Sequence, residues 1–346
     1  MLLILVPLTL NTGCRKEDYS TPRGKAIKDY NDHYLGSYVP DPLWTGYVSN
    51  CVEGTISDDA RSKVLMRLNY FRRLVGLSDN ITENYLQRQD CQKASLIFKA
   101  EGNLSHFPTS SWACYTPEGA AAAATSNIAW GTAVNGEWSV HTTYGVTGFI
   151  EEPGDNNTKV GHRAWFFLPG LHSIGIGSTN TTCCMQWKDN YDVTGPAPEF
   201  IAYPPNGYMP NKLVFPRWSF CIPGGDAGFE DAAVSMTDDK GKNVPLTLVN
   251  RPAATPGKAL LPQLVWEPSL DVSAIKSDKR YTVTVTNVSG TAEGSYVYEV
   301  IVVPVDAVKE RRDPSVTDDR RILGLLRPDR KRVENPSIHI AGCKPF

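Results

Sequence analysis

Alternation of apolar and polar residues in the C-terminal half of the chain is the feature that most constrains its fold. The segments RYTVTVTNV (280–288) and SYVYEVIVV (295–303) carry apolar side chains at every second position, which is typical of strands with one buried face. Four shorter runs, KLVFPRWSF, AAVSMT, VPLTLV and QLVWEP, precede them and are separated by turn residues. Six or seven short strands over about 110 residues predict an all-β, immunoglobulin-like sandwich over residues 201–306.

Helical signals come first in the N-terminal half. Ser57, followed by two aspartates, predicts a helix N-terminus, and apolar residues recur at helical spacing until Gly76 ends the helix. Thr82 is expected to cap a second helix that closes near Gly102. Thr116 and a following proline predict a third helix over the alanine run that comes next.

Strand signals follow a fourth predicted helix, which contains residues 146–150 and is broken by Pro153-Gly154. The runs HRAWFFL (162–168), HSIGIGST (172–179) and CCMQW (183–187) are each expected to form a strand. Helices and strands are mixed here without βαβ alternation, so the fold class is α+β. The predicted organisation is a mixed domain over 57–187, a Pro-rich linker over 188–200 and the β-sandwich.

The two chain ends differ from both domains. Residues 1–14 resemble a signal peptide whose end, NTGC, resembles a bacterial lipobox, so Cys14 is a candidate lipidation site. A cleaved signal with an incidental Cys14 is the alternative. Residues 15–56 are expected to be a tether with an irregular lead-in, and 307–346 a charged, disordered tail. These features predict a secreted, outer-membrane or cell-surface lipoprotein of a bacterium.

Charge and cysteine content narrow the classes of function. The formal net charge is −2, which argues against nucleic-acid binding and against membrane contact other than through the N-terminal anchor. Eight cysteines in an exported chain predict disulfides, with a connectivity that the sequence leaves open. On a strand, the neighbours Cys183 and Cys184 would point to opposite faces. No cysteine or histidine cluster has the spacing of a structural zinc site.

The mixed domain resembles the CAP superfamily (cysteine-rich secretory, antigen 5 and pathogenesis-related-1 proteins) in its bacterial form. The resemblance covers roughly residues 58–179 and depends on the order of several short motifs. They are LNxxRRxxGL (68–77), LSH (104–106), TSNIAWG (125–131), FIEEPG (149–154) with GHR (161–163), and WFFLPGLHSIGIGST (165–179). Six residues are inserted before the histidine of GHR. The resemblance implies an α-β-α sandwich domain.

The resemblance also implies a site in which two histidines and two acids face a shared cleft. Carried over by position, these are His106, His162 and Glu152, while the first acid falls on Ser126. A serine cannot supply the missing negative charge. The implied site is therefore a triad with Ser126 and Asn127 as hydrogen-bonding neighbours. His106 and His162, with Glu152 and water, would suit Zn²⁺.

Three functions remain open from the sequence. The first is a monomeric exported protein whose cleft binds a lipid, a sterol or a glycan. The second is a metal-assisted, peptidase-like hydrolase in which His106, Glu152 and His162 are catalytic, since a Glu–His pair can act as general base and acid near neutral pH. The third is a structural envelope protein in which these residues only form hydrogen bonds. His141 and His172 are predicted to be structural or exposed.

Overall fold

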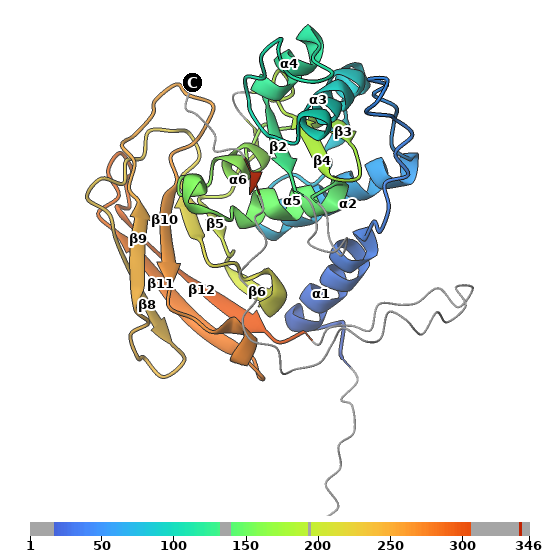
Figure 1. The fold of residues 1–346 in the computed structure, drawn as a ribbon. Helices are drawn as coiled ribbons and strands as arrows, with labels where there is room; N and C mark the ends of the chain where they lie inside the picture. Colours follow the sequence, from blue (N-terminus) through green and yellow to red (C-terminus); the bar gives the residue numbers. More distant parts are fainter. Residues whose placement is uncertain (1–16, 132–139, 193–194, 306–338, 341–346) are drawn as a thin grey trace, which may run out of the picture.

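The computed structural model describes residues 17–131, 140–192, 195–305 and 339–340. Helices surround a five-stranded sheet in the first part of the molecule, and two four-stranded sheets form the second part (Figure 1). The mixed helix and sheet content confirms the α+β class.

The first part is built on a sheet with strand order β1-β3-β4-β2-β13. Antiparallel pairing joins β3 to β4 and β4 to β2, whereas the short β1 pairs parallel with β3. The bounds of its strands are β1 Thr82–Glu83, β2 Ser126–Trp130, β3 Ser173–Ser178, β4 Thr182–Gln186 and β13 His339–Ile340. Its helices are α1 Pro22–Asp29, α2 Asp58–Leu74, α3 Arg88–Glu101, α4 Pro117–Ala124, α5 Thr142–Glu151 and α6 Gly161–Phe166.

Side chains on the two faces of β4 belong to different apolar clusters. Cys184 packs with residues of α3 and α4, whereas Cys183 belongs to the larger cluster that includes α2 and α5. Successive residues of a strand point to opposite faces, so helices cover both faces of this sheet. The predicted divergence of Cys183 and Cys184 is confirmed.

Helix α2 begins and ends as its sequence predicts. The Ser57 side chain accepts a hydrogen bond from the backbone amide of Ala60 (3.2 Å), and the helix stops two residues before Gly76, whose φ is +77°. This pairing satisfies an amide at the helix start that has no partner within the helix. The fully buried Arg72 reaches across to the carbonyl oxygens of Phe166 and Leu168 (2.7 and 3.0 Å), which fixes α2 against the turn after α6.

The second part consists of two sheets, β5-β7-β10-β9 and β6-β12-β11-β8, whose facing side chains form one core. Phe220 of one sheet contacts Tyr296 of the other (ring centroids 5.3 Å), and Trp266 Nε1 lies 3.4 Å from Met236 Sδ across the interface. This arrangement is a β-sandwich. Its strands are β5 Ile201–Tyr203, β6 Gly207–Pro210, β7 Trp218–Cys221, β8 Ala233–Asp238, β9 Leu246–Asn250, β10 Leu264–Pro268, β11 Lys279–Thr286 and β12 Ser295–Val303. Five of the six predicted runs form strands over most of their length. In the sixth, KLVFPRWSF (212–220), only residues 218–220 belong to a strand, and residues 211–213 form a 3₁₀ turn.

The predicted strand at 162–168 is wrong, because this run forms helix α6 over residues 161–166. Every side chain from residue 160 to 168 is buried. A run that is apolar on all sides has no period, so it does not distinguish a buried strand from a short buried helix.

The prediction for Thr82 is also wrong. Thr82 opens β1 and pairs with Ser173, and α3 begins six residues later, at Arg88. The side chain of Asn84 accepts a hydrogen bond from the Leu86 amide (3.1 Å) in an intervening 3₁₀ turn, a local alternative that competes with a helix. Leu86 is consequently 91% exposed rather than buried on the predicted helix.

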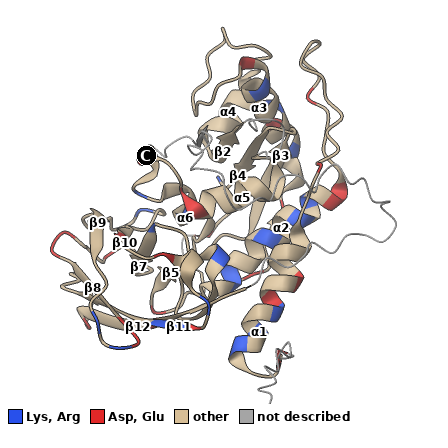
Figure 2. Cartoon of the chain, turned by 60° about the horizontal axis from the view of Figure 1, so that its bottom comes forward, with Lys and Arg blue, Asp and Glu red and all other residues tan. Residues whose placement is uncertain are grey.

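Part of the segment expected to be irregular is helical. Helix α1 is followed by a π-helical turn over residues 30–34 and a 3₁₀ turn over residues 35–37. Its start has a recognisable signal, Thr21 as N-cap and Pro22 at the first helical position. Arg23 pairs with Asp278 of the second part (2.8 Å), and Arg73 of α2 pairs with Asp29 (2.6 Å). Basic and acidic residues are interspersed along these helices (Figure 2).

The predicted signal peptide with Cys14 and most of the predicted tail lie outside the described residues. Two residues of that tail are described as β13, which pairs antiparallel with β2, His339 opposite Trp130. No helix within the described residues has the length and apolarity needed to cross a membrane.

Candidate functional site

The end of helix α5 directs Glu152 toward α6. Glu152 adopts the left-handed conformation (φ +59°), and its amide donates to the carbonyl oxygen of Gly148 (2.8 Å). Pro153 and Gly154 then prevent the helix from continuing. His162 lies in the first turn of α6, ten positions after Glu152.

The Glu152 carboxylate is fully engaged by α6. Its Oε2 atom lies 2.7 Å from His162 Nδ1, and its Oε1 atom accepts a hydrogen bond from the backbone amide of Arg163 (2.8 Å). Because a carboxylate accepts hydrogen bonds, Nδ1 carries the proton in this contact. Both side chains are 0% exposed. Two of the three predicted triad residues are thus in direct contact.

The surroundings of His162 hold its ring and its backbone. The Phe149 ring stacks on the imidazole (centroids 5.3 Å, planes 23° apart), and Asn127 Nδ2 donates to the His162 carbonyl oxygen (3.0 Å). The predicted neighbour Asn127 therefore contacts the backbone of His162 and joins β2 to α6.

His106 and Ser126 are both anchored to the last turn of α4. His106 Nδ1 donates to the carbonyl oxygen of Ala123 (2.8 Å), and Ser126 Oγ donates to that of Ala122 (2.6 Å). In the described parts of the chain, no three His, Cys, Asp or Glu side chains are grouped so that they could hold a metal ion. The zinc site stays a prediction from the resemblance.

The β-sandwich reaches this region through Arg217, which precedes β7. Its Nη1 atom donates to the carbonyl oxygens of Glu152 (2.5 Å) and Gly154 (2.7 Å), while Nε donates to Glu267 (2.9 Å). These bonds hold the backbone of the left-handed turn from the side of the second part.

Arg163 makes a second connection between the two parts. Its guanidinium donates to the carbonyl oxygen of Ile150 (2.7 Å) and to Ser219 Oγ (3.0 Å), and lies 4.8 Å from the ring centroid of Tyr203. Complete burial lowers the pKa of Arg163 to about 10, so the group remains charged at neutral pH. Arg163 and Arg217 are not among the site residues predicted from the sequence, although Arg163 stands next to His162 in the GHR motif.

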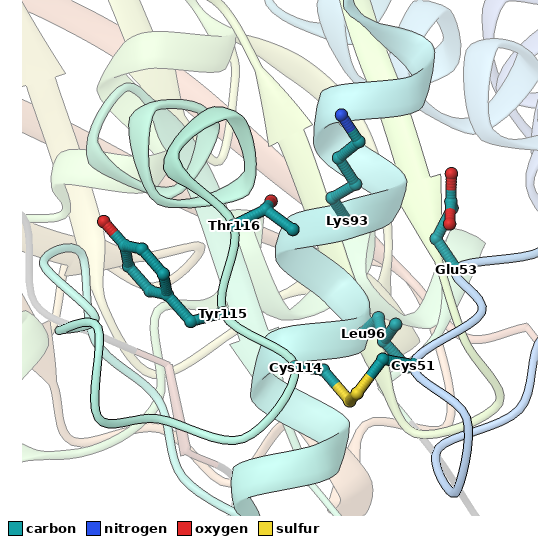
Figure 3. A pocket seen from close by; sticks show the side chains of 7 residues that line it. All are labelled: Cys51, Glu53, Lys93, Leu96, Cys114, Tyr115 and Thr116. Carbon is teal, nitrogen blue, oxygen red and sulfur yellow. A yellow bond between two sulfur atoms is a disulfide. The ribbon is translucent and has the colours of Figure 1, made fainter.

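A pocket of about 160 Å³ lies elsewhere, beside the disulfide Cys51–Cys114 (Cα–Cα 5.1 Å). Lys93 and Leu96 of α3 line one wall, and Glu53, Tyr115 and Thr116 complete it (Figure 3). Glu53 and Lys93 both have polar partners, Gln89 at 3.2 Å and Glu118 at 3.4 Å. The disulfide confirms that the cysteines form at least one bond, between positions the sequence could not pair.

Comparisons of the chain with protein-family models, curated proteins and solved structures find no match.

Proposed function

We propose that this chain is an exported, non-catalytic binding protein of the bacterial cell surface, with a CAP-like domain followed by an immunoglobulin-like sandwich. The observation that carries the proposal is the complete burial of Glu152 and His162 together with the engagement of both carboxylate oxygens. The pair is buried, both carboxylate oxygens are hydrogen-bonded, and the contact ties α5 to α6 without an exposed surface for a substrate.

Export is supported by two observations. Residues 1–10 are an apolar run of signal-peptide size, and the lipobox-like NTGC with Cys14 follows it. The Cys51–Cys114 disulfide is typical of proteins from oxidising compartments. The CAP-like motifs and the appended sandwich suggest a surface-anchored monomer that binds a lipid, a sterol or a glycan.

The hydrolase is the second candidate, and one contact favours it. The 2.7 Å bond between Glu152 and His162 Nδ1 orients the imidazole and selects its tautomer, as general bases require. In that mechanism Glu152 would hold His162, and His106 with Zn²⁺ would complete the site.

Native mass spectrometry of the protein isolated from its own membrane tests the binding function. We expect a co-purifying small molecule that organic extraction removes. A ligand-free mass in repeated preparations would contradict binding and favour the structural envelope protein.

A peptide and ester panel separates binding from catalysis. The proposal predicts equal background rates for the wild type and Glu152→Gln, which keeps the size of the side chain and removes its charge. If the wild type turns over a substrate of the panel and Glu152→Gln does not, the proposal is wrong and the hydrolase is favoured. Calorimetric zinc titration of wild type and His162→Ala is the parallel test for metal, and the proposal predicts two flat traces.

A further inference from the structure

Helix α3 lies against β3 at two glycines. A β-carbon added at Gly177 would lie 2.2 Å from the carbonyl carbon of Cys91, and one added at Gly175 would lie 2.9 Å from Cys91 Sγ. Only residues without a side chain permit this approach. The glycines therefore bring the backbone of α3, at Cys91, directly onto the sheet.

Cys184 lies beside this contact. It is the cross-strand partner of Gly177 in the antiparallel pair β3–β4, so its Cα atom is a direct neighbour of the glycine that Cys91 touches. Cys91 and Cys184 belong to the same apolar cluster, and both are 0% exposed. A disulfide needs Cα atoms about 5–6 Å apart and side chains directed at each other. The packing of α3 on Gly177 places Cys91 next to the strand position opposite Cys184.

We propose that Cys91 and Cys184, which are thiols in this structure, form a second disulfide while the exported chain folds. The inference rests on the export in the proposed function. The bond would join α3 to the sheet and close a long loop of the chain. Since Lys93 and Leu96 of α3 line the pocket beside Cys51–Cys114, it would also fix that wall to the core.

Cys183 and Cys221 are not partners for this bond. Cys183 faces the other side of β4, where a β-carbon at Gly145 of α5 would lie 2.3 Å from its sulfur. Cys221 lies in the sandwich, on β7, next to Ile201 of β5. The adjacent Cys183 therefore provides a matched comparison with Cys184, and Cys221 a buried thiol far from both.

The oxidation is a thiol–disulfide exchange with a disulfide oxidoreductase or oxidised glutathione. One cysteine loses its proton and its thiolate attacks the oxidant's disulfide, which forms a mixed disulfide and releases one oxidant thiol. The thiolate of the other cysteine then displaces the second oxidant sulfur. Two protons leave the protein, and its two electrons reduce the oxidant to two thiols. Burial and the contact with Cys184 raise the pKa of the Cys91 thiol in the folded chain, so exchange precedes the docking of α3.

Peptide mapping of the full chain, exported with its own leader, tests the inference. The protein is denatured in iodoacetamide without reductant and digested with trypsin, which separates Cys91 (peptide 89–93), the Cys183–Cys184 pair (164–188) and Cys221 (218–240). We expect 89–93 linked to 164–188 at a mass two hydrogen atoms below the sum, with Cys183 and Cys221 alkylated. Fragmentation between Cys183 and Cys184 locates the bond, and Cys183→Ala confirms it independently.

The Cys51–Cys114 bond, mapped in the same digest as 29–61 linked to 100–159, separates the two proposals. If it is present while Cys91 and Cys184 are both alkylated, the second disulfide is refuted and export stands. If all four cysteines are alkylated, both proposals fail. A bond from Cys91 to Cys183 would contradict the assignment of faces on β4.

Discussion

Arg163 and Trp266 are both fully buried large side chains, but they stabilise their regions in different ways. Trp266 packs between the two sheets of the sandwich among residues that alternate along the strands. Arg163 satisfies a carbonyl oxygen at the end of α5 and a hydroxyl group of the other part. The sandwich core depends on apolar area removed from water, whereas the α5–α6 region adds to its own apolar packing a few polar bonds between distant segments. Removing an apolar side chain from the sandwich and removing a hydrogen-bond donor from the α5–α6 region should therefore have separable effects on the free energy of unfolding.

Trp266→Ala is expected to give the largest effect. Removing a fully buried indole leaves a cavity between the sheets, with a loss of about 4 kcal/mol in the free energy of unfolding. Urea denaturation measures it. Val297→Ala on β12, where the side chain is 62% exposed, is the matched control and should change stability by less than about 0.5 kcal/mol. Equal losses would show that the sandwich does not depend on its core in the way described.

Arg163→Met is expected to give the second largest effect, a loss of about 3 kcal/mol in the free energy of unfolding. Methionine keeps an apolar stem but leaves the Ile150 carbonyl oxygen and the Ser219 hydroxyl without their donor. The same denaturation experiment applies, with Arg280→Met as control, because the Arg280–Glu299 pair is half exposed and worth at most about 0.5 kcal/mol. If Arg163→Met loses as little stability as the control, the hydrogen bonds of Arg163 do not stabilise the α5–α6 region as described.

The pH dependence of stability isolates His141, the N-cap residue of α5. Burial lowers its pKa from 6.5 to about 4, so the unfolded chain binds a proton in a range where the folded chain does not. The stabilising contribution is complete above pH 6.5 and falls as the pH drops toward 4, by about 2 kcal/mol between pH 7 and 5.

His141→Gln should remove this part of the slope, whereas His172→Gln, at an exposed site, should leave it intact. Denaturation midpoints at pH 7 and 5 measure both variants. An unchanged slope in His141→Gln would assign the dependence to other groups.

Ser126→Ala should give the smallest of these effects, about 1 kcal/mol. Ser126 Oγ donates one hydrogen bond to the Ala122 carbonyl oxygen and joins β2 to α4. Thermal unfolding measures the change, and Thr109→Ala, whose hydroxyl bonds the nearby Ser111 at the surface, provides a control. A much larger loss would indicate that Ser126 has a further role in the site.

Sequence reasoning succeeded where the signal is local. The alternation in 280–288 and 295–303 reports one buried face per strand, and β11 and β12 follow it closely. The caps at Ser57 and Thr116 act within three residues, so both helix starts were predictable. The strand predicted at 162–168 was wrong because no local signal distinguishes it from a helix: uniform burial removes the hydrophobic period.

The candidate site was only partly predictable. Glu152 and His162 were placed by resemblance, and their contact depends on the left-handed turn after α5. Nothing in the residues around Arg217 indicates that its guanidinium would bond the carbonyl oxygens of Glu152 and Gly154, over sixty positions earlier.

By itself, the sequence determined the α+β class, most strands of the sandwich and several helix ends, since each follows from side chains a few residues apart. The tertiary structure decided which groups meet: Cys51 with Cys114, Arg163 with Ser219, and α3 with the glycines of β3. The physical reason is that such contacts form only when distant segments pack together, and the packing of the whole chain selects them.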